Sequence, residues 1–384
     1  MPAPDENFHR SLKRAVAIIS LDAEQIWGHL DLLNEQQFCE RYPSALAAYD
    51  RLLGVLCSAG VSATWLVVGG MALAESDGPR DPRLLGLPAR WTRSIPPGDE
   101  GIAALWYRRS FVKRLAEARP KQDVGLHGGL THLIWTDWRS KPEVIRREFF
   151  GGIEALEAVR VRPVSFSFPR NQEACHGLLA SNGILCYRGR PPVLSEKLGR
   201  TLPGSLLRIL EELGRATPPP VWPKETLPGL WNIPASLFLY PIGESRSRLV
   251  VLRSRIERVA RGLDAAIRHN GVFHFCLHPV NLAESPKGFS VFEGILERIL
   301  KARESGDIET LTMAELAARM AQEKGNGISA PALYTETLAP SPALSELCMN
   351  PSSGPEGAAL TGKTGAPGPV NLHLEDEPRL QNLS

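Results

Sequence analysis

The 384-residue chain lacks the features that mark membrane-bound and secreted proteins. No apolar run approaches the roughly 18 residues of a membrane span, and the N-terminal segment MPAPDENFHRSLKR has acidic residues but no apolar core of a signal peptide. The six cysteines form no C-x-x-C pair, and several lie within apolar runs, as buried free thiols do. These absences predict a soluble protein of a reducing compartment, and we expect it in the cytoplasm.

The chain also has little net charge and no internal repeat. Its 44 Lys and Arg residues against 42 Asp and Glu residues give a net charge of +2, too small a field to attract nucleic acid. The missing repeat disfavours a solenoid or propeller. A hydrophobic content of 43% is enough for a substantial core, so we expect a globular protein with a small or neutral ligand.

Strand-like apolar runs recur along the chain, and helical patterns lie between most of them. The runs are Ala15–Leu21, Thr64–Val68, Asp123–Leu126, Pro163–Phe168, Leu185–Tyr187, Phe273–Leu277 and, more weakly, Glu309–Leu311. Alternating strands and helices predict an α/β protein with a largely parallel sheet. About seven strands with covering helices favour one closed or nearly closed barrel over two independent domains.

Three S/T-x-x-E sequences predict helix starts, because each side chain can accept from an orphan backbone donor of the first turn. They begin at Ser140, Ser290 and Thr312. Helical spacing of leucines and other apolar residues also predicts helices over Ser44–Cys57 and Leu252–His269.

Composition divides the chain into an N-terminal extension (1–14), a barrel domain (15–324) and a tail (325–384). The tail is rich in Ala, Pro, Gly, Ser and Thr and is expected to be disordered. Within the barrel, segment 201–243 carries many prolines, which exclude a long helix or a central strand. Its Trp222, Trp231 and Tyr240 could line a groove or belong to a rigid packed cover.

Four of the apolar runs end at residues suited to hydrolytic chemistry. The residues that follow these four runs are, in order, Asp22 with Glu24, His127 with His132 nearby, Arg170, and His278. In barrels of parallel strands, the loops that leave the carboxyl ends of the strands face one mouth. We therefore expect these side chains to form one site.

The two carboxylates and two histidines suit a divalent metal. One carboxylate of Asp22 and Glu24 could bind the ion while the other acts as general base. His127 and His132 lie in HGGLTH, where glycines permit the tight backbone path that brings two imidazoles to one ion. A His₂-carboxylate site leaves coordination positions open for water and substrate, as catalytic zinc sites do. Alternatively, one or both histidines only cap local backbone.

The remaining candidates have one functional and one structural interpretation each. His278 could act as general acid or be an exposed loop histidine, with His274 on the same strand as a competitor. Arg170 could orient the base, bind substrate oxygen, or form an ordinary surface salt bridge. Substrate-binding candidates are Trp27 and Trp135, as an aromatic floor for a sugar ring or as core residues, together with Asn171 and Asn281.

Five segments, SLDAE, ATWLVVGG, DVGLHGGLTH, SFSFPRN and FCLHP, follow one another over roughly Ala15–Met320. In these segments the chain resembles the polysaccharide deacetylases of carbohydrate esterase family 4, the NodB-homology group. The resemblance implies a distorted (β/α) barrel, a divalent metal that is usually zinc, and removal of N-acetyl, sometimes O-acetyl, groups from sugars. It makes Asp22 the base, Glu24, His127 and His132 the metal ligands, and His278 the acid.

The chain departs from the family pattern at three places. Ala23 stands where the first motif has a second aspartate, and Glu24 follows one residue later. His127 and His132 are five residues apart rather than four, and Arg170 follows Pro169 instead of preceding a proline.

The resemblance predicts a metal-dependent hydrolase that removes an acetyl group from an acetylated sugar or glycoconjugate precursor. Two alternatives are a hydrolase of another non-peptide C–N bond, and an inactive carbohydrate-binding protein whose metal site was lost through the departures. A non-haem iron oxygenase is disfavoured because no carboxylate directly follows His127.

Overall fold

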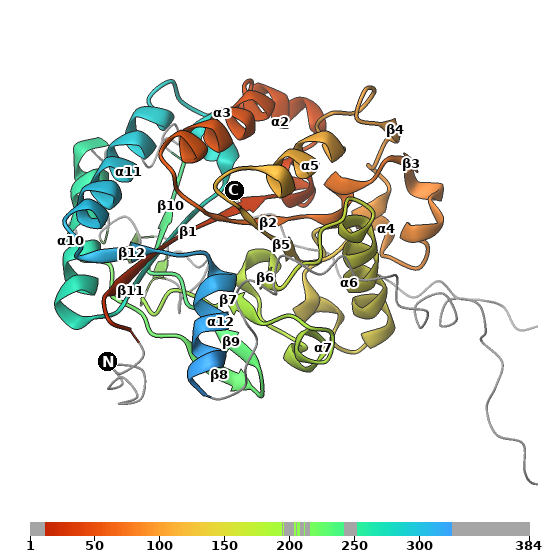
Figure 1. The fold of residues 1–384 in the computed structure, drawn as a ribbon. Coiled ribbons are helices and arrows are strands. Elements are labelled where there is room, and N and C mark those ends of the chain that lie inside the picture. Colours follow the sequence, from red (N-terminus) through yellow and green to blue (C-terminus); the bar gives the residue numbers. More distant parts are fainter. Residues whose placement is uncertain are drawn as a thin grey trace, which may run out of the picture. The chain divides into compact units, whose positions relative to one another are not determined.

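Strands and helices alternate to build a curled, mostly parallel sheet with helices arranged around its outside (Figure 1). The computed structural model describes residues 12–193, 216–241 and 252–324, with positions 195, 203, 204, 206, 207 and 211. These residues all belong to one compact unit, Met1–Glu336. The predicted tail at 325–384 and most of the N-terminal extension lie outside the described residues.

The large sheet has ten strands in the order β10-β11-β1-β2-β5-β6-β7-β9-β8, with β12 also paired to β1. Its strands are β1 (Ala15–Ala23), β2 (Thr64–Val67), β5 (Asp123–His127), β6 (Ser165–Ser167), β7 (Cys186–Arg188), β8 (Lys224–Leu227), β9 (Leu230–Asn232), β10 (Leu237–Leu239), β11 (Val272–Leu277) and β12 (Ile308–Thr310). All pairs are parallel except β8 with β9. The α/β fold, a distorted barrel that stays open between β10 and β8, is the predicted one.

Helices connect and cover these strands. They are α2 (Glu35–Arg41), α3 (Ala45–Ser58), α4 (Ala89–Thr92), α5 (Arg109–Glu117), α6 (Pro142–Glu157), α7 (His176–Ala180), α10 (Leu252–His269), α11 (Gly288–Glu304) and α12 (Met313–Glu323). A small hairpin of β3 (Glu75–Asp77) and β4 (Pro97–Asp99), which the sequence patterns do not predict, lies between β2 and α5.

The described part of the proline-rich segment carries the chain from one edge of the sheet to the other. β9 pairs with β7, whereas β10, only a few residues later, pairs with β11. Each of these strands has three residues, in keeping with the many prolines. Trp231 is almost fully buried and Trp222 packs against the same core cluster, so these two rings favour the packed cover over the groove.

Two apolar cores lie on the two faces of the sheet. The larger one is between the sheet and the surrounding helices, and the smaller one is inside the barrel. In the smaller core, Val16 and Ile18 of β1 and Val272 of β11 meet Met313 and Leu316 of α12. Helix α12 therefore closes the barrel at the amino ends of its strands.

Only one of the three predicted capping boxes forms. Thr312 precedes α12. Its hydroxyl accepts from the Glu315 backbone N–H, and its own backbone N–H donates to the Glu315 carboxylate. The helix start predicted near Ser140 is confirmed, because α6 begins at Pro142, but neither of the other two boxes forms. Lys141 occupies the N-cap of α6 because Pro142 takes the first helical position, and Ser290 lies within α11.

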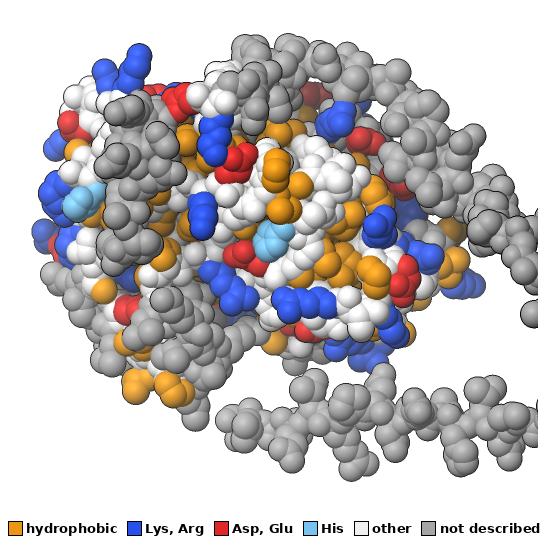
Figure 2. Space-filling model, turned by 90° about the horizontal axis from the view of Figure 1, so that it is seen from below, with side chains coloured by type: hydrophobic (Ala, Val, Ile, Leu, Met, Phe, Trp, Pro, Cys, Tyr) orange, Lys and Arg blue, Asp and Glu red, His pale blue; other side chains and the backbone are white. Residues whose placement is uncertain are grey.

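The described surface mixes charges of both signs. On the face in Figure 2, Lys and Arg side chains and Asp and Glu side chains are spread among hydrophobic ones. No helix in the described ranges is long and apolar enough to cross a membrane. The five described cysteines are free thiols, of which Cys186 and Cys276 are buried, and Cys348 lies outside these ranges.

Candidate active site

The end of β1 brings two carboxylates into the mouth of the barrel. β1 is buried along its whole length, and Asp22 pairs in register with Leu66 of β2. After Ala23 the chain turns into the 3-10 segment Gln25–His29 (η1), so Glu24 leaves the regular strand. Both carboxylates are almost fully buried, and both contact residues from other strands.

Glu24, His127 and His132 converge on one point. Glu24 Oε2 lies 3.1 Å from His127 Nε2 and 3.2 Å from His132 Nε2, and the two Nε2 atoms are 3.2 Å apart. All three side chains are buried. They are the one group of three His, Cys, Asp or Glu residues within the described ranges that is close enough to hold a metal ion.

The HGGLTH loop absorbs the extra residue between the histidines through its glycines. Gly128 has a φ of 73°, which a side chain would strain, and a Cβ on Gly129 would lie 2.3 Å from the Glu148 carbonyl oxygen. The buried Glu148 carboxylate accepts from the Thr131 N–H and hydroxyl at 2.8 and 2.9 Å. Burial raises the pKa of Glu148 to about 7, although these hydrogen bonds lower it. Glu148 of α6 thus fixes the HGGLTH loop in place.

The donor set fits a divalent cation. His127 Nδ1 faces Ser167, at 2.6 Å from its Oγ and 3.2 Å from its carbonyl oxygen. A hydrogen on Nδ1 satisfies that carbonyl and leaves the Nε2 lone pair toward Glu24 and His132, as ligating histidines require. Tetrahedral zinc with bonds of 2.0–2.2 Å holds its ligand atoms about 3.3 Å apart, close to the spacing here. Three acceptor atoms this close repel one another unless a cation or a proton lies between them.

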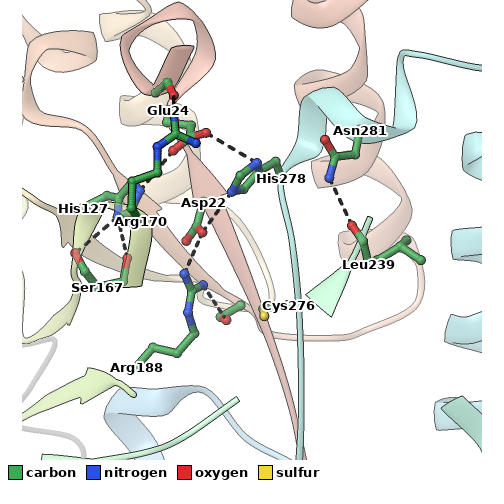
Figure 3. Close-up of polar contacts among 12 residues, drawn as sticks. Asp22, Glu24, His127, Ser167, Arg170, Arg188, Leu239, Cys276, His278 and Asn281 are labelled. Atoms are coloured by element: carbon green, nitrogen blue, oxygen red, sulfur yellow. Dashed lines mark hydrogen bonds and ion pairs between the residues drawn. The ribbon is translucent and has the colours of Figure 1, made fainter. Parts of the chain in front are cut away.

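Asp22 lies between Arg188 and His278 (Figure 3). Arg188 Nη2 donates to Asp22 Oδ2 at 2.6 Å, and His278 Nε2 is 3.3 Å from the same oxygen. Burial raises the pKa of Asp22, but Arg188 and then His127 lower it by more. The pKa of this carboxyl therefore lies well below its usual range. The other oxygen, Oδ1, is buried and has no hydrogen-bond partner in the described structure.

His278 follows β11, and each of its ring nitrogens faces a carboxylate. Nε2 faces Asp22, and Nδ1 lies 3.4 Å from Glu24 Oε1. Its side chain is 21% exposed, so a molecule in the mouth can reach it. Burial lowers the pKa of His278, but Glu24 and Asp22 raise it more, and the net direction is upward. This arrangement favours the protonated imidazole that a general acid needs.

His274, the competitor on the same strand, lies below the site. It is fully buried and bonds to Ser20 rather than to a carboxylate. The structure therefore favours His278 as the histidine that faces the mouth.

The prediction that Arg170 orients the base is wrong. Its Nη2 donates to the Gly28 carbonyl oxygen at 2.9 Å and to Asp31 Oδ1 at 2.5 Å, so it forms the ordinary salt bridge. Arg170 follows Pro169 in a 3-10 turn (η6, Pro169–Asn171) and has a φ of 55°, which aims the side chain at η1 instead of Asp22.

Arg188 is the site residue that sequence reasoning missed. It ends β7 directly after the predicted run Leu185–Tyr187, so it obeys the same strand-end rule that located the other candidates. The run is short and is followed by a second arginine, Arg190, so position alone did not single out Arg188.

The two tryptophans do not form a substrate floor. Trp27 is fully buried, and its indole N–H donates to the Trp106 carbonyl oxygen at 2.7 Å. Trp135 is fully buried among the rings of Phe149, Phe166 and Phe168. Neither ring offers a face to a sugar, so the core interpretation holds for both.

The two asparagines differ. Asn281 is buried and its amide donates to the Leu239 carbonyl oxygen at 3.0 Å, away from the carboxylates (Figure 3). It ties the 3-10 turn Pro279–Leu282 (η8) to β10, which corrects its prediction as a substrate ligand. Asn171 is partly exposed beside Arg170, with a φ of 53°, and its substrate role stays a prediction.

Comparisons with known proteins identify the fold of this chain but not its substrate or its reaction. No family model and no curated protein matches the sequence. Among solved structures, a protein described as a polysaccharide deacetylase from Mycobacterium smegmatis matches with a TM-score of 0.52 and 18% identity, covering 84% of this chain and 94% of that one. A second protein described as a polysaccharide deacetylase, from Pseudomonas aeruginosa PAO1, matches with a TM-score of 0.51 and 11% identity, covering 84% of this chain and 95% of that one.

Puue allantoinase matches with a TM-score of 0.52 and 10% identity, again covering 84% of this chain and 95% of its own. The predicted resemblance to polysaccharide deacetylases is confirmed at the level of the fold.

Proposed function

We propose that this protein is a metal-dependent hydrolase that removes an N-acetyl group from a sugar or glycoconjugate precursor. One observation carries the proposal: the ligand atoms of Glu24, His127 and His132 form a buried triangle that could hold a metal ion, and Asp22 and His278 lie directly beside it. The shared fold with proteins described as polysaccharide deacetylases supports the reaction class. It does not identify the substrate.

The chain's own residues supply a base and an acid. Asp22 Oδ1 has no partner, so it can take a proton from the attacking water while Arg188 retains Oδ2. His278, held protonated by the two carboxylates, can then give a proton to the leaving amine nitrogen. Acetate and a free amine result.

The metal would be held by Glu24, His127 and His132, and zinc is the ion that this donor set suits best. When bound, a divalent cation supplies Lewis-acid chemistry, which activates water and polarises the acyl oxygen. Ser167 and Glu148 support the ligand loop from behind.

The proposal includes a cytoplasmic location, which would favour a nucleotide-sugar, lipid-linked or oligosaccharide intermediate over a finished cell-wall polymer. A second candidate, hydrolysis of another non-peptide C–N bond, is supported by the match to an allantoinase of equal TM-score, whose name refers to a different substrate. A panel of acetylated sugars and small cyclic or linear amides separates the two by product.

The test is metal content by mass spectrometry, together with acetate release from acetylated sugars. We expect near-stoichiometric metal in the wild type and its loss in a His127→Ala, His132→Ala double variant. His269→Ala is the matched control, because that histidine is exposed on α10, away from the site.

Asp22→Asn separates the base from the ligands. We expect it to keep the metal and to lose acetate release by about 10²-fold or more, because Asp22 lies outside the triangle. A wild-type protein that binds no metal, even after zinc is added, would contradict the proposal and favour the inactive carbohydrate-binding alternative.

A further inference from the structure

A buried polar layer lies beneath Asp22 inside the barrel. The inward-facing side chains of β1 alternate along the strand as Val16, Ile18, Ser20 and Asp22. The first two belong to the apolar core, but Ser20 is polar and fully buried. Two further polar side chains contact it, Arg188 from β7 and His274 from β11, and they are 2% and 0% exposed.

The hydrogen bonds of this layer run outward from Arg188 on both sides. Arg188 can only donate, and it donates through Nη2 to Asp22 and through Nη1 to Ser20 Oγ at 3.3 Å. The Ser20 hydroxyl is left with its own hydrogen to donate. His274 Nε2 lies 2.8 Å from Ser20 Oγ and is the acceptor.

The far side of His274 fixes its tautomer. Nδ1 lies 3.1 Å from the carbonyl oxygen of Pro234 and 3.2 Å from that of Ile233. A carbonyl oxygen can only accept, so Nδ1 carries the hydrogen and Nε2 carries the lone pair. Burial and the charge of Arg188 lower the pKa of His274 to about 3, which agrees with a neutral ring.

The layer is arranged around one carboxylate oxygen. Buried polar groups are costly unless they are bonded, and apolar residues would fill this level of the barrel with less loss of solvation. The series of hydrogen bonds starts at the Pro234 carbonyl oxygen, passes through His274, Ser20 and Arg188, and ends at Asp22 Oδ2. Asp22 Oδ1 has no hydrogen-bond partner in the described structure.

We propose that Ser20 and His274 are positioning residues that fix the Arg188 guanidinium, and through it the Asp22 carboxylate, with Oδ1 turned to the reacting water. The inference rests on the proposed function in one respect, the role of Asp22 as general base. In the described structure, the side chains of Ser20 and His274 form no hydrogen bond with the proposed metal ligands.

The kinetic test compares Ser20→Ala with Ser236→Ala. Ser236 is also buried, and its hydroxyl accepts from the His274 backbone N–H at 3.1 Å. It is not one of the residues in the series of hydrogen bonds that ends at Asp22. We expect Ser20→Ala to lower kcat by about tenfold with KM and metal content unchanged, because it removes a bond to a charged group. Ser20→Thr keeps the hydroxyl and should restore kcat. Equal losses in the two alanine variants, or no rescue by threonine, would overturn the proposal.

A second readout does not depend on activity. In ¹⁵N-histidine NMR spectra, the signal that His274→Gln removes should report a neutral ring with hydrogen on Nδ1 from about pH 5 to pH 8. The slowly exchanging guanidinium signals of Arg188 should be lost in Ser20→Ala and kept in Ser236→Ala.

A charged ring or hydrogen on Nε2 would overturn the network. If the NMR results hold while the wild type releases no acetate from any sugar, the proposed function fails and the network stands.

Discussion

Asp22 is a buried carboxylate whose charge depends most on one neighbour, Arg188. Burial alone would raise its pKa, and the opposite direction follows mainly from Arg188, at 2.6 Å. Arg188 in turn is buried and matched by the same carboxylate. The two charges are therefore tolerated inside the barrel only as a pair.

This pairing predicts strong coupling between the two residues. Arg188→Met should lower the free energy of unfolding by about 3–5 kcal/mol, because it leaves the Asp22 charge buried and uncompensated. The double variant Asp22→Asn, Arg188→Met should lose clearly less than the sum of the single losses. Urea unfolding of the four proteins at pH 7 measures this, and additive losses would argue against the pair.

Sequence reasoning located single residues better than their partners. Asp22, Glu24, His127, His132 and His278 all follow from the rule that parallel strand ends meet at one mouth, and the structure brings them together. The partner of Asp22 lies 166 residues away across the barrel. Spacing carries no information on which of several strand-end arginines points inward, so Arg170 was assigned in place of Arg188.

Helix α12 shows how a local cap contributes to the fold. The Thr312 hydroxyl accepts from the Glu315 N–H at 3.1 Å, and the Glu315 carboxylate accepts from the Thr312 N–H at 2.8 Å. We expect Thr312→Ala to lower the free energy of unfolding by about 1 kcal/mol. Ser290→Ala, from the same sequence pattern but exposed within α11, should leave stability unchanged within about 0.5 kcal/mol. Chemical denaturation compares the two, and equal losses would refute the capping role.

Asp123 joins three elements through one carboxylate oxygen. It accepts from the Ser165 hydroxyl at 2.7 Å, the Thr64 hydroxyl at 2.9 Å and the Ala314 N–H of α12 at 3.3 Å. Burial raises its pKa from 3.8 to about 6 even though these bonds lower it. The folded protein thus holds this proton more tightly than the unfolded chain does.

The raised pKa predicts a pH-dependent contribution to stability. The contribution is complete below pH 3.8 and is lost as the pH rises to about 6. Asp123→Asn cannot titrate, so the free energy of unfolding of the wild type minus that of the variant should fall by about 3 kcal/mol over this range. Denaturation curves at several pH values measure the difference, and a constant difference would contradict the raised pKa.

Elements with a regular pattern were predictable, and short irregular ones were not. Each of the seven apolar runs overlaps a strand of the sheet, and Leu252–His269 is helical over its full predicted length. β8, β9 and β10 were missed because their three or four residues lie among prolines, where composition argues against a strand. β9 pairs with β7 and β10 pairs with β11, and both pairings come from tertiary contacts.

At the scale of the whole molecule, the proposed metal should link binding to folding. The triangle joins β1 to the loop after β5, which an unfolded chain does not hold together. Free zinc at about 100-fold its Kd should raise the free energy of unfolding by about 2.7 kcal/mol. Thermal unfolding with and without a chelator tests this. The chelator should destabilise His269→Ala, as it does the wild type, and should leave the His127→Ala, His132→Ala variant unchanged. An equal response in that double variant would place the ion elsewhere.

The two ends of the barrel are not equivalent. Met313 of α12 donates its N–H to Thr64, the first residue of β2, and its side chain joins the apolar residues that fill the interior below Ser20. Helix α12 therefore covers one end of the barrel, while Asp22 lies near the other end of β1. Under the proposed function, the substrate has to approach from the end opposite α12, so the acetyl group of a long substrate must be the part that reaches inward.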